Sequence, residues 1–468
     1  MADATLKDRL AEICRRVIGH GGTVESLRRL TGGASQQIWS FEYGGVPLIL
    51  RRSDGDDSVS TSQGLLGSEQ EATLIDCLHA KGVMVPRVYT LLCPEDGIGT
   101  GFVMSRIQGE ALPARLLKDD IYKPALDVFV SDCARELARI HNAGSVTINP
   151  PLPVRTPAER VRQLLEIYKM QDSPNAILAA ALKWLRDHIP KSHAMTLVHG
   201  DFRMGNLLLE PTGISAVLDW ELAHIGDPVF DLAYLCAPCW RFGRYDKPVG
   251  GVGHIEELLE AYEAASGTGV DRAHFDFWLV YSSTWWALTC RVMLGAWRNH
   301  EVRTLERAVI GTRVSENEID LLLLLESLCG LESEAPIDWP ADTMTDGAGA
   351  THTNELAIAL GEWVDAELKP RFEGRDLFQA RVAGNALGIL ERRTRLGPVY
   401  KGQKVRRLDA LGLSNAELTA KLLDGRLGLS SPGILQHLRL TATEHVLIDQ
   451  PRYAGLKVAK GKWTEPAA

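Results

Sequence analysis

The first 105 residues alternate between apolar and polar positions in the way that β-strands require. In QQIWSFEYGGVPLILRR, the aromatic residues Trp39, Phe41 and Tyr43 alternate with their neighbours up to a Gly-Gly pair, and a second apolar run follows. Alternation on both sides of a glycine turn predicts a β-hairpin. The segment SEQEATLIDCLHAKG has helical spacing and ends at a glycine, which predicts a helix. Further strands are expected in MVPRVYTLL and GTGFVMSRIQG.

Beyond residue 105 the apolar spacing is helical, with one interruption. The interruption, His199–Asp219, contains two short apolar runs around a Pro-Thr-Gly turn and predicts a second hairpin. Near residue 340, a polar stretch with two Pro and two Gly residues indicates a linker. We therefore expect a β-rich lobe over residues 1–105, a helical lobe over 106–332, a linker over 333–353 and a separate helical domain over 354–468.

The expected C-terminal domain shows clear helix signals. Apolar residues at positions 356, 360, 363 and 364 fall on one face of a first helix. The segment FQARVAGNALGILERRTRLGP ends in Gly-Pro, which predicts that the next helix stops before Pro398. Ser414 and Glu417 have the spacing of a capping box and predict the start of a third helix.

Composition limits the classes of function. The chain has 468 residues, a formal net charge of -9 and the apolar content of an ordinary globular protein, so a nucleic-acid partner is not expected. The N-terminal segment lacks the pattern of a signal peptide, and no apolar run is long enough to span a membrane, so we expect a cytoplasmic protein without a membrane partner. The eight cysteines include one CAPC pair without a second pair at zinc-site spacing, which favours reduced thiols over a metal or redox site.

The second predicted hairpin carries polar residues at both ends. Asp201 and Asn206 precede its first strand, and Asp219 follows its second. Isolated Asp and Asn residues are usually exposed to solvent and have no further role. Together, however, these three residues have the spacing that phosphoryl transfer requires. One carboxylate orients a hydroxyl and accepts its proton, while an amide oxygen and a second carboxylate hold the Mg²⁺ that bridges the nucleotide phosphates.

The segments HGDFRMGNLLL and VLDWELAHIGDPVFDLAYL resemble the aminoglycoside phosphotransferase-like kinases, the small-molecule kinases that include choline kinase and are relatives of the protein kinases. With LRR and FVMSRIQG, they are most similar to the branch that includes the kinase-like region of certain acyl-CoA dehydrogenases. This resemblance covers roughly residues 10–330. It implies an α+β, two-lobed protein-kinase-like fold, here followed by an all-α domain, with ATP and Mg²⁺ as cofactors. The segment RFEGRDLFQARVAGNALGILERR is similar to a helical domain of unknown role that is often fused to such kinases.

The resemblance implies roles for five residues around the second hairpin. Asp201 would be the catalytic aspartate, and Asn206 and Asp219 would be the metal ligands. Asp231 would hold the backbone of the catalytic loop. His199 would brace the same loop rather than transfer protons.

The nucleotide contacts are expected in the β-rich lobe. The segment LTGGASQQIW would cover the phosphates, with Gly32, Gly33 and Ser35 allowing close approach of the backbone, although such a turn also occurs without a ligand. The backbone of Ser105–Ile107 matches the interlobe hinge and would contact adenine.

Arg51 occupies the strand position where these kinases carry a lysine. Glu71 in the following helix is its expected partner, with Glu69 second. Arginine binds phosphate well but is not a neutral replacement for lysine.

The catalytic pattern indicates a hydroxyl acceptor without identifying it. Aminoglycosides are polycations that require an acidic pocket, and no acidic cluster stands out in residues 150–300. The segment STWWALTCRVMLGAWRNH is either a packed helix or the wall of an apolar, partly cationic pocket. By resemblance we expect a small hydroxylated acceptor such as a hydroxyacyl-CoA. An antibiotic kinase and a catalytically weak nucleotide-binding regulator remain as alternatives, and the pattern does not specify an oligomeric state.

Overall fold

The computed structural model describes residues 3–19, 21–30, 37–53, 64–144, 148–171, 173–191, 193–301, 303–331, 335–340 and 353–464. Contacts group the chain into two compact units. The first consists of residues 1–157, 191–242 and 246–275, and the second of residues 158–190, 243–245 and 276–468. The four-part division expected from the sequence stays a prediction.

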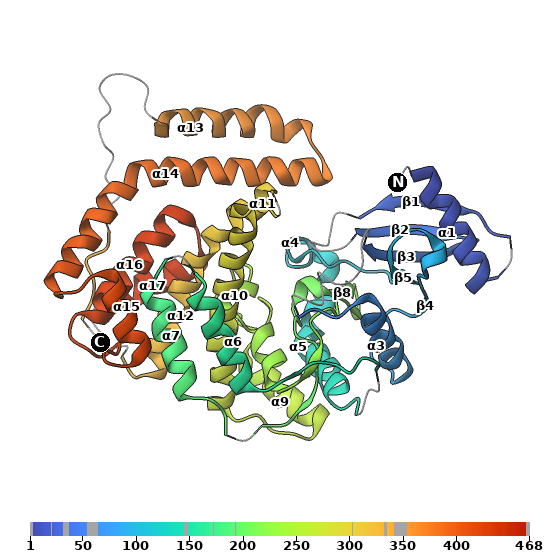
Figure 1. The fold of residues 1–468 in the computed structure, drawn as a ribbon, viewed down its shortest axis with the longest axis horizontal. Helices are drawn as coiled ribbons and strands as arrows, with labels where there is room; N and C mark the ends of the chain where they lie inside the picture. Colours follow the sequence, from blue (N-terminus) through green and yellow to red (C-terminus); the bar gives the residue numbers. More distant parts are fainter. Residues whose placement is uncertain are drawn as a thin grey trace. The chain divides into compact units, whose positions relative to one another are not determined.

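A five-stranded antiparallel sheet lies at the N-terminal end of the first unit (Figure 1). The predicted hairpin at the Gly-Gly pair is confirmed, since Tyr43 pairs with Val46 across the turn. Gly44 and Gly45 have φ values of +58° and +83°, a pair of positive values that favours glycine at both turn positions. The strands, in the order in which they pair, are β1 (Val24–Arg29), β2 (Gln37–Tyr43), β3 (Val46–Ser53), β5 (Thr100–Ser105) and β4 (Val88–Leu91).

Two helices are associated with this sheet. Helix α1 (Asp3–Val17) buries Leu6 and Leu10 in a core shared with Phe41 and Leu50 of the sheet. Helix α3 (Ser68–Ala80) forms where the sequence predicts a helix and ends before Gly82.

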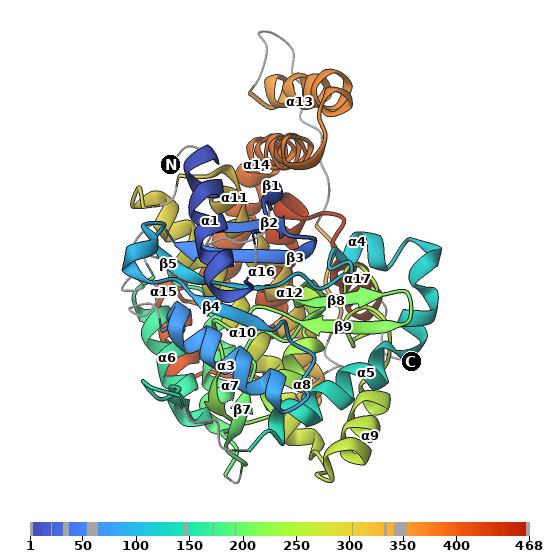
Figure 2. The ribbon, with the colours of Figure 1, turned by 90° about the vertical axis from the view of Figure 1, so that its right-hand side faces the viewer.

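The second predicted hairpin, within residues 199–219, also belongs to the first unit, next to helices. Strands β8 (Leu207–Glu210) and β9 (Gly213–Val217) pair antiparallel, which confirms that prediction (Figure 2). The strand pair is adjacent to α5 (Lys123–His141). The remaining elements are α4 (Pro113–Leu116), β6 (Val154–Arg155), β7 (Thr196–Val198), β10 (His224–Gly226), α8 (Val229–Leu235) and α9 (Ile255–Ser266), with 3₁₀ turns η1 (Pro94–Asp96), η2 (Asp120–Tyr122), η3 (Met204–Asn206) and η4 (Pro238–Trp240).

In the part that the structure describes, the second unit contains helices and no strands. Its core is formed by apolar faces such as that of α12 (Val314–Leu328), in which Ile319, Leu321 and Leu322 are fully buried. The other helices are α6 (Pro157–Lys169), α7 (Ala176–Asp187), α10 (Arg272–Arg298), α11 (Leu305–Val309), α13 (Thr353–Trp363), α14 (Gly374–Ala410), α15 (Asn415–Asp424), α16 (Ile434–Asp449) and α17 (Ala454–Thr464), with short turns η5 (Ile310–Arg313), η6 (Val364–Leu368) and η7 (Lys369–Arg371).

The predicted helix stop before Pro398 is wrong, because α14 continues through this residue to Ala410. A proline inside a helix removes one hydrogen bond and costs about 3 kcal/mol. Packing offsets this cost on both sides of the proline, where Leu396 and Tyr400 are buried against Ile448 of α16. The capping box at Ser414 is confirmed and begins α15.

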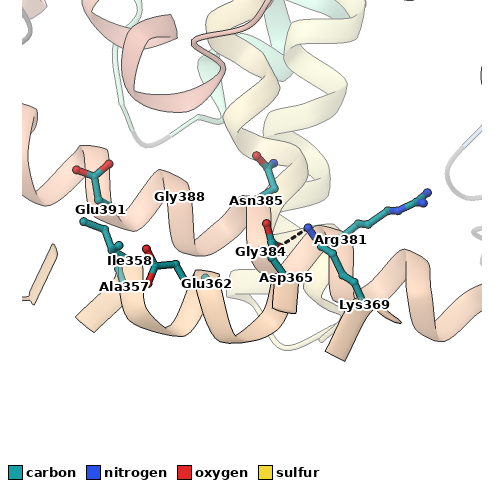
Figure 3. A pocket seen from close by; sticks show the side chains of 11 residues that line it. Ala357, Ile358, Glu362, Asp365, Lys369, Arg381, Gly384, Asn385, Gly388 and Glu391 are labelled. Atoms are coloured by element: carbon teal, nitrogen blue, oxygen red, sulfur yellow. Dashed lines mark ion pairs between the residues drawn. The ribbon is translucent and has the colours of Figure 1, made fainter. Parts of the chain in front are cut away.

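Helix α13 forms as predicted and lies alongside α14 (Figure 1). Its expected apolar face is divided, since Val364 is buried while Leu356, Leu360 and Trp363 are each more than half exposed. A cavity of about 380 Å³ lies between α13 and α14, and Asp365 and Lys369 form an ion pair at its edge (Figure 3). None of the site residues predicted from the sequence lines this cavity.

Candidate active site

The loop that joins β7 to β8 carries Asp201, and Asp231 fixes its backbone. Asp231 is fully buried on α8. Its Oδ2 accepts a hydrogen bond from His199 N at 2.7 Å, and its Oδ1 accepts one from Gly200 N at 3.0 Å. Gly200 has a φ of +90°, and a Cβ at this position would overlap with the carbonyl of Leu222, so only glycine fits.

His141, which the sequence analysis did not single out, contacts the same carboxylate. Its Nε2 lies 3.3 Å from Asp231 Oδ2, and its Nδ1 lies 2.8 Å from the hydroxyl of Tyr262. Burial acts to raise the pKa of Asp231, but the hydrogen bonds and the charge of His141 outweigh it and hold this pKa below its usual value. In the sequence, His141 was only one histidine on a helix, far from Asp231 along the chain.

His199 links the catalytic loop to the end of β9. Its Nδ1 accepts a hydrogen bond from Asp201 N at 3.1 Å, and its Nε2 lies 3.0 Å from the carbonyl oxygen of Leu218. An N–H donor at one ring nitrogen and a carbonyl acceptor at the other define a neutral ring with its proton on Nε2. The ring also packs against Trp220, with the centroids 4.5 Å apart.

Asp201 and Asn206 are in direct contact. Asn206 Nδ2 donates to Asp201 Oδ2 at 2.6 Å and to the Asp201 carbonyl at 3.0 Å. Both amide hydrogens are therefore used, and within the described residues Oδ1 of Asn206 accepts no hydrogen bond. Burial raises the pKa of Asp201, the nearby charge of Arg203 lowers it and that of Asp219 raises it, with a net increase.

Arg51 joins the sheet to the end of the second hairpin. Its Nη1 lies 2.8 Å from Glu71 Oε1, so the structure brings together the pair that the sequence suggested. Its Nη2 lies 3.1 Å from Asp219 Oδ1 and 2.8 Å from Glu221 Oε2. One guanidinium thus contacts three carboxylates, Glu71 through one terminal nitrogen and Asp219 and Glu221 through the other.

Glu221 is a second residue that the sequence analysis missed. Asp219 and Glu221 are two positions apart, and both carboxylates contact the same nitrogen of Arg51. Asp219 has a φ of +68°, a left-handed conformation that is costly for a residue with a Cβ. Its side chain nevertheless remains 37% exposed, so one carboxylate in this cluster is accessible to a ligand.

Glu71, the partner of Arg51, has a raised pKa. Burial raises the pKa of Glu71 to about 7, the charges of Asp219 and Glu221 act in the same direction, and the charge of Arg51 opposes them. The pKa of Arg51 is itself raised, because Glu71, Asp219 and Glu221 together outweigh its burial. Arg51 is therefore a permanent cation in this site.

The expected hinge follows β5. Ser105 N donates to the Arg87 carbonyl at 2.9 Å and Arg106 N to the Pro47 carbonyl at 3.0 Å. In the part of the chain that the structure describes, the Ile107 N–H donates to no protein acceptor. Gly32, Gly33 and Ser35, which were expected over the phosphates, lie outside the described residues.

A buried loop aspartate, an accessible carboxylate after a hairpin and an ion pair between sheet and helix are the parts that a phosphotransferase combines. The family described as "Phosphotransferase enzyme family" matches residues 26–278, more than half of the chain. The chain belongs to this family. Residues 370–453 match a domain of unknown function (DUF6285).

Curated relatives carry a similar region within longer proteins. The chain is 27% identical over 283 residues to acyl-CoA dehydrogenase family member 10 of Mus musculus, a match that covers 55% of this chain and 25% of that protein. It is 26% identical over 277 residues to acyl-CoA dehydrogenase family member 11 of Gallus gallus, covering 55% of this chain and 35% of that protein. The matched region thus spans about a quarter to a third of these relatives.

Solved structures share the fold at low sequence identity. A Ralstonia eutropha JMP134 protein assigned to the aminoglycoside phosphotransferases has a TM-score of 0.53 at 22% identity, covering 66% of this chain and 95% of that one. A choline/ethanolamine kinase family protein from Mesorhizobium loti has a TM-score of 0.50 at 16% identity, covering 70% and 99%. The fold expected from the sequence, α+β with a β-rich lobe and a helical lobe, is confirmed.

The described residues contain neither a candidate membrane span nor a cluster of metal-binding side chains. None of the described helices has the length and apolar composition needed to cross a bilayer. No group of three or more His, Cys, Asp and Glu side chains in these residues is arranged to hold a metal ion, and the eight cysteines, all described, form no disulfide.

Proposed function

We propose that this protein transfers the γ-phosphoryl group of Mg²⁺-ATP to a hydroxyl group of a small molecule. The observation that carries the proposal is the arrangement of Asp201, Asn206 and Asp219 beside Arg51. Phosphoryl transfer depends on positioning and on charge stabilisation, which such an arrangement supplies.

Asp201 acts as the base that orients the acceptor hydroxyl and accepts its proton. Its two oxygens are fixed by Arg203 Nε and Asn206 Nδ2, so the carboxylate cannot rotate freely. His199 and Asp231 are positioning residues, since they hold the loop backbone on either side of Asp201. Both ring nitrogens of His199 are occupied by backbone hydrogen bonds, so neither is free to exchange a proton with the acceptor.

The residues present fit a magnesium ion. Mg²⁺ prefers hard oxygen ligands and keeps several waters, so few protein ligands suffice. Asn206 Oδ1 and the accessible carboxylate of Asp219 supply such oxygens. The bound ion would supply charge neutralisation between the nucleotide phosphates.

The nucleotide is held by groups of the β-rich lobe. Arg51 binds its phosphates and is oriented by Glu71, while the backbone of Ser105–Ile107, where the Ile107 N–H has no protein acceptor, contacts adenine. The expected role of Gly32, Gly33 and Ser35 at the phosphates stays a prediction, since these residues lie outside the described part of the chain.

For the acceptor we propose a small hydroxylated molecule of the hydroxyacyl-CoA class. The support is the set of curated relatives, which are named as acyl-CoA dehydrogenases and could act on the same acyl groups. An aminoglycoside-type acceptor and a catalytically weak regulator are the competing proposals.

A metabolite screen tests the reaction. Pooled metabolites that include hydroxyacyl-CoA species and aminoglycosides are incubated with Mg²⁺-ATP and wild-type protein, Asp201→Asn or Asp119→Asn, an exposed control. By mass spectrometry we expect one class of molecule to gain a single phosphate with wild type and the control. With Asp201→Asn the rate falls about 10²- to 10⁴-fold. Undiminished turnover in Asp201→Asn contradicts the mechanism.

Nucleotide binding separates the metal residues from the base. Asp219→Asn is expected to remove the Mg²⁺-dependent part of ATP affinity, whereas Asp201→Asn leaves most of it, as isothermal titration calorimetry with and without Mg²⁺ can measure. Unchanged Mg²⁺-dependent affinity in Asp219→Asn contradicts the metal assignment.

A further inference from the structure

Arg203, two positions after the catalytic aspartate, is held by two contacts. Its Nε donates to Asp201 Oδ1 at 3.0 Å. Its guanidinium carbon lies 4.6 Å from the centre of the Trp240 ring, the cation–π geometry that fixes an arginine over an aromatic face. A Cβ at Gly205 would overlap with Nη1 of Arg203, so the absence of a side chain at this position makes room for the guanidinium.

The remaining donors of Arg203 are available. Within the described residues, Nη1 and Nη2 donate to no protein acceptor, and the side chain is 26% exposed. An arginine that serves only to pair with a carboxylate usually does so through two parallel N–H groups. Here a single Nε contacts Asp201, and the terminal N–H groups remain free beside the residue that receives the acceptor's proton.

The CAPC segment has a structural role at Arg203, because it directly precedes Trp240. Its two cysteines are buried and form no disulfide, and the burial raises the pKa of the Cys236 thiol to about 12, so Cys236 is not a reactive thiolate. The segment instead leads into η4, which delivers Trp240 to Arg203.

We propose that Arg203 is a catalytic residue that binds an oxyanion at the point of phosphoryl transfer. This rests on the proposed function, since Asp201 marks the transfer point. The oxyanion is either the terminal phosphoryl group of the nucleotide or an acidic group of the acceptor. In both cases the planar guanidinium offers the N–H groups of Nη1 and Nη2 as donors, while its Nε contacts Asp201.

The test measures binding, so it does not need the acceptor. The ligands are ADP and the β,γ-imido analogue of ATP, each with Mg²⁺, and inorganic phosphate added to the Mg²⁺-ADP complex. The variants are Arg203→Met, Arg203→Lys and Gly205→Ala, which displaces the guanidinium without removing it. Arg272→Met is the matched control, since Arg272 also pairs with a carboxylate (Glu256) and stacks on an aromatic ring (Phe275).

If the nucleotide supplies the oxyanion, Arg203→Met and Gly205→Ala lose about ten- to a hundredfold in affinity for the ATP analogue with ADP affinity unchanged. Arg203→Lys is expected to lose less, and Arg272→Met nothing. If the acceptor supplies it, the preference for the ATP analogue is retained, but the Mg²⁺-ADP complexes of Arg203→Met and Gly205→Ala no longer bind phosphate.

The proposal is overturned if both affinities in folded Arg203→Met or Gly205→Ala equal those of wild type. Should Arg203→Met fail to fold, Gly205→Ala decides, because its only change is a displaced guanidinium. A wild-type protein that binds no nucleotide would contradict the proposed function instead. In that case the binding of inorganic phosphate alone is compared between wild type and Gly205→Ala. Weaker binding in the variant supports the role of Arg203, and equal binding overturns it.

Discussion

Asp231 shows how a single buried carboxylate determines the shape of the catalytic loop. It accepts from two successive backbone N–H groups and contacts His141, and no water-exposed surface remains on it. Removing one acceptor from such a group leaves a buried donor without a partner, which costs about 1–3 kcal/mol.

We expect Asp231→Asn to slow phosphoryl transfer strongly while changing nucleotide affinity little. The amide can accept only one of the two loop hydrogen bonds, so the loop loses its fixed position relative to the acceptor hydroxyl. Steady-state kinetics should show a fall in kcat with a nearly constant KM for ATP. A thermal melt checks that the variant is folded, and an unchanged kcat would show that the loop does not depend on this carboxylate.

His437 on α16 makes stability depend on pH. Burial lowers its pKa to about 4, and the charges of Arg407 and Lys404 act in the same direction. Between pH 6.5 and 4 the unfolded chain binds a proton at this residue that the folded chain does not, so stability falls as the pH falls. We expect this residue to account for a loss of roughly 2–3 kcal/mol by pH 4.

Urea unfolding of wild type and His437→Leu over this pH range isolates the contribution of His437. The difference in unfolding free energy between the two proteins should shift in favour of the variant as the pH falls. A difference that is constant with pH would mean that His437 titrates alike in both states.

At the level of elements, α14 shows packing overcoming a local stop signal. The Gly-Pro pair at 397–398 reads as a helix end, yet both flanks of the helix are tied to α16. Arg393 pairs with Asp449 before the proline, and Arg407 contacts Glu444 after it. Such contacts lie outside any window of sequence that contains the proline.

Pro398→Ala is therefore expected to stabilise the protein. Alanine restores the N–H that proline lacks and removes the steric conflict with the preceding turn, for a gain of about 1–3 kcal/mol. Chemical denaturation measures the gain, and Pro432→Ala, in a turn outside the helices, serves as the control. A loss of stability in Pro398→Ala would mean that α14 needs the proline's rigidity.

At the level of the molecule, α12 and the C-terminal helices share buried charges within the second unit. Arg439 of α16 makes a two-pronged ion pair with Glu326, with both N–O distances at 2.9 Å and both side chains at most 2% exposed. Trp463 donates to the same carboxylate, and the hydroxyl of Tyr453 donates to Asp320. The C-terminal helices thus complete the polar partners of α12.

Arg439→Met is expected to destabilise the whole unit by about 3–5 kcal/mol, because Glu326 is left buried without its cation. Arg426→Met should have no measurable effect, since its pair with Asp424 is exposed. Denaturant unfolding of the two variants compares the pairs. Equal stability of both variants would show that the C-terminal helices do not depend on this buried pair.

The sequence by itself determined the local elements and the identity of the chemical groups. Alternation and glycine turns predicted both hairpins. The HGDFRMGN and VLDW segments identified Asp201, Asn206 and Asp219 as candidate site residues, because the spacing of residues within one short segment limits how far apart their side chains can lie. Arg51 and Glu71 were paired by resemblance to a family pattern.

Only the tertiary structure decided contacts between segments that are distant along the chain. His141 joins Asp231 from another helix, Trp240 reaches Arg203, and packing against α16 carries α14 through Pro398. Periodicity reports which face of an element is apolar, but not which element covers it. The partner of a buried charge depends on the fold, since the free-energy cost of removing the charge from water is offset only where another segment brings a partner to it.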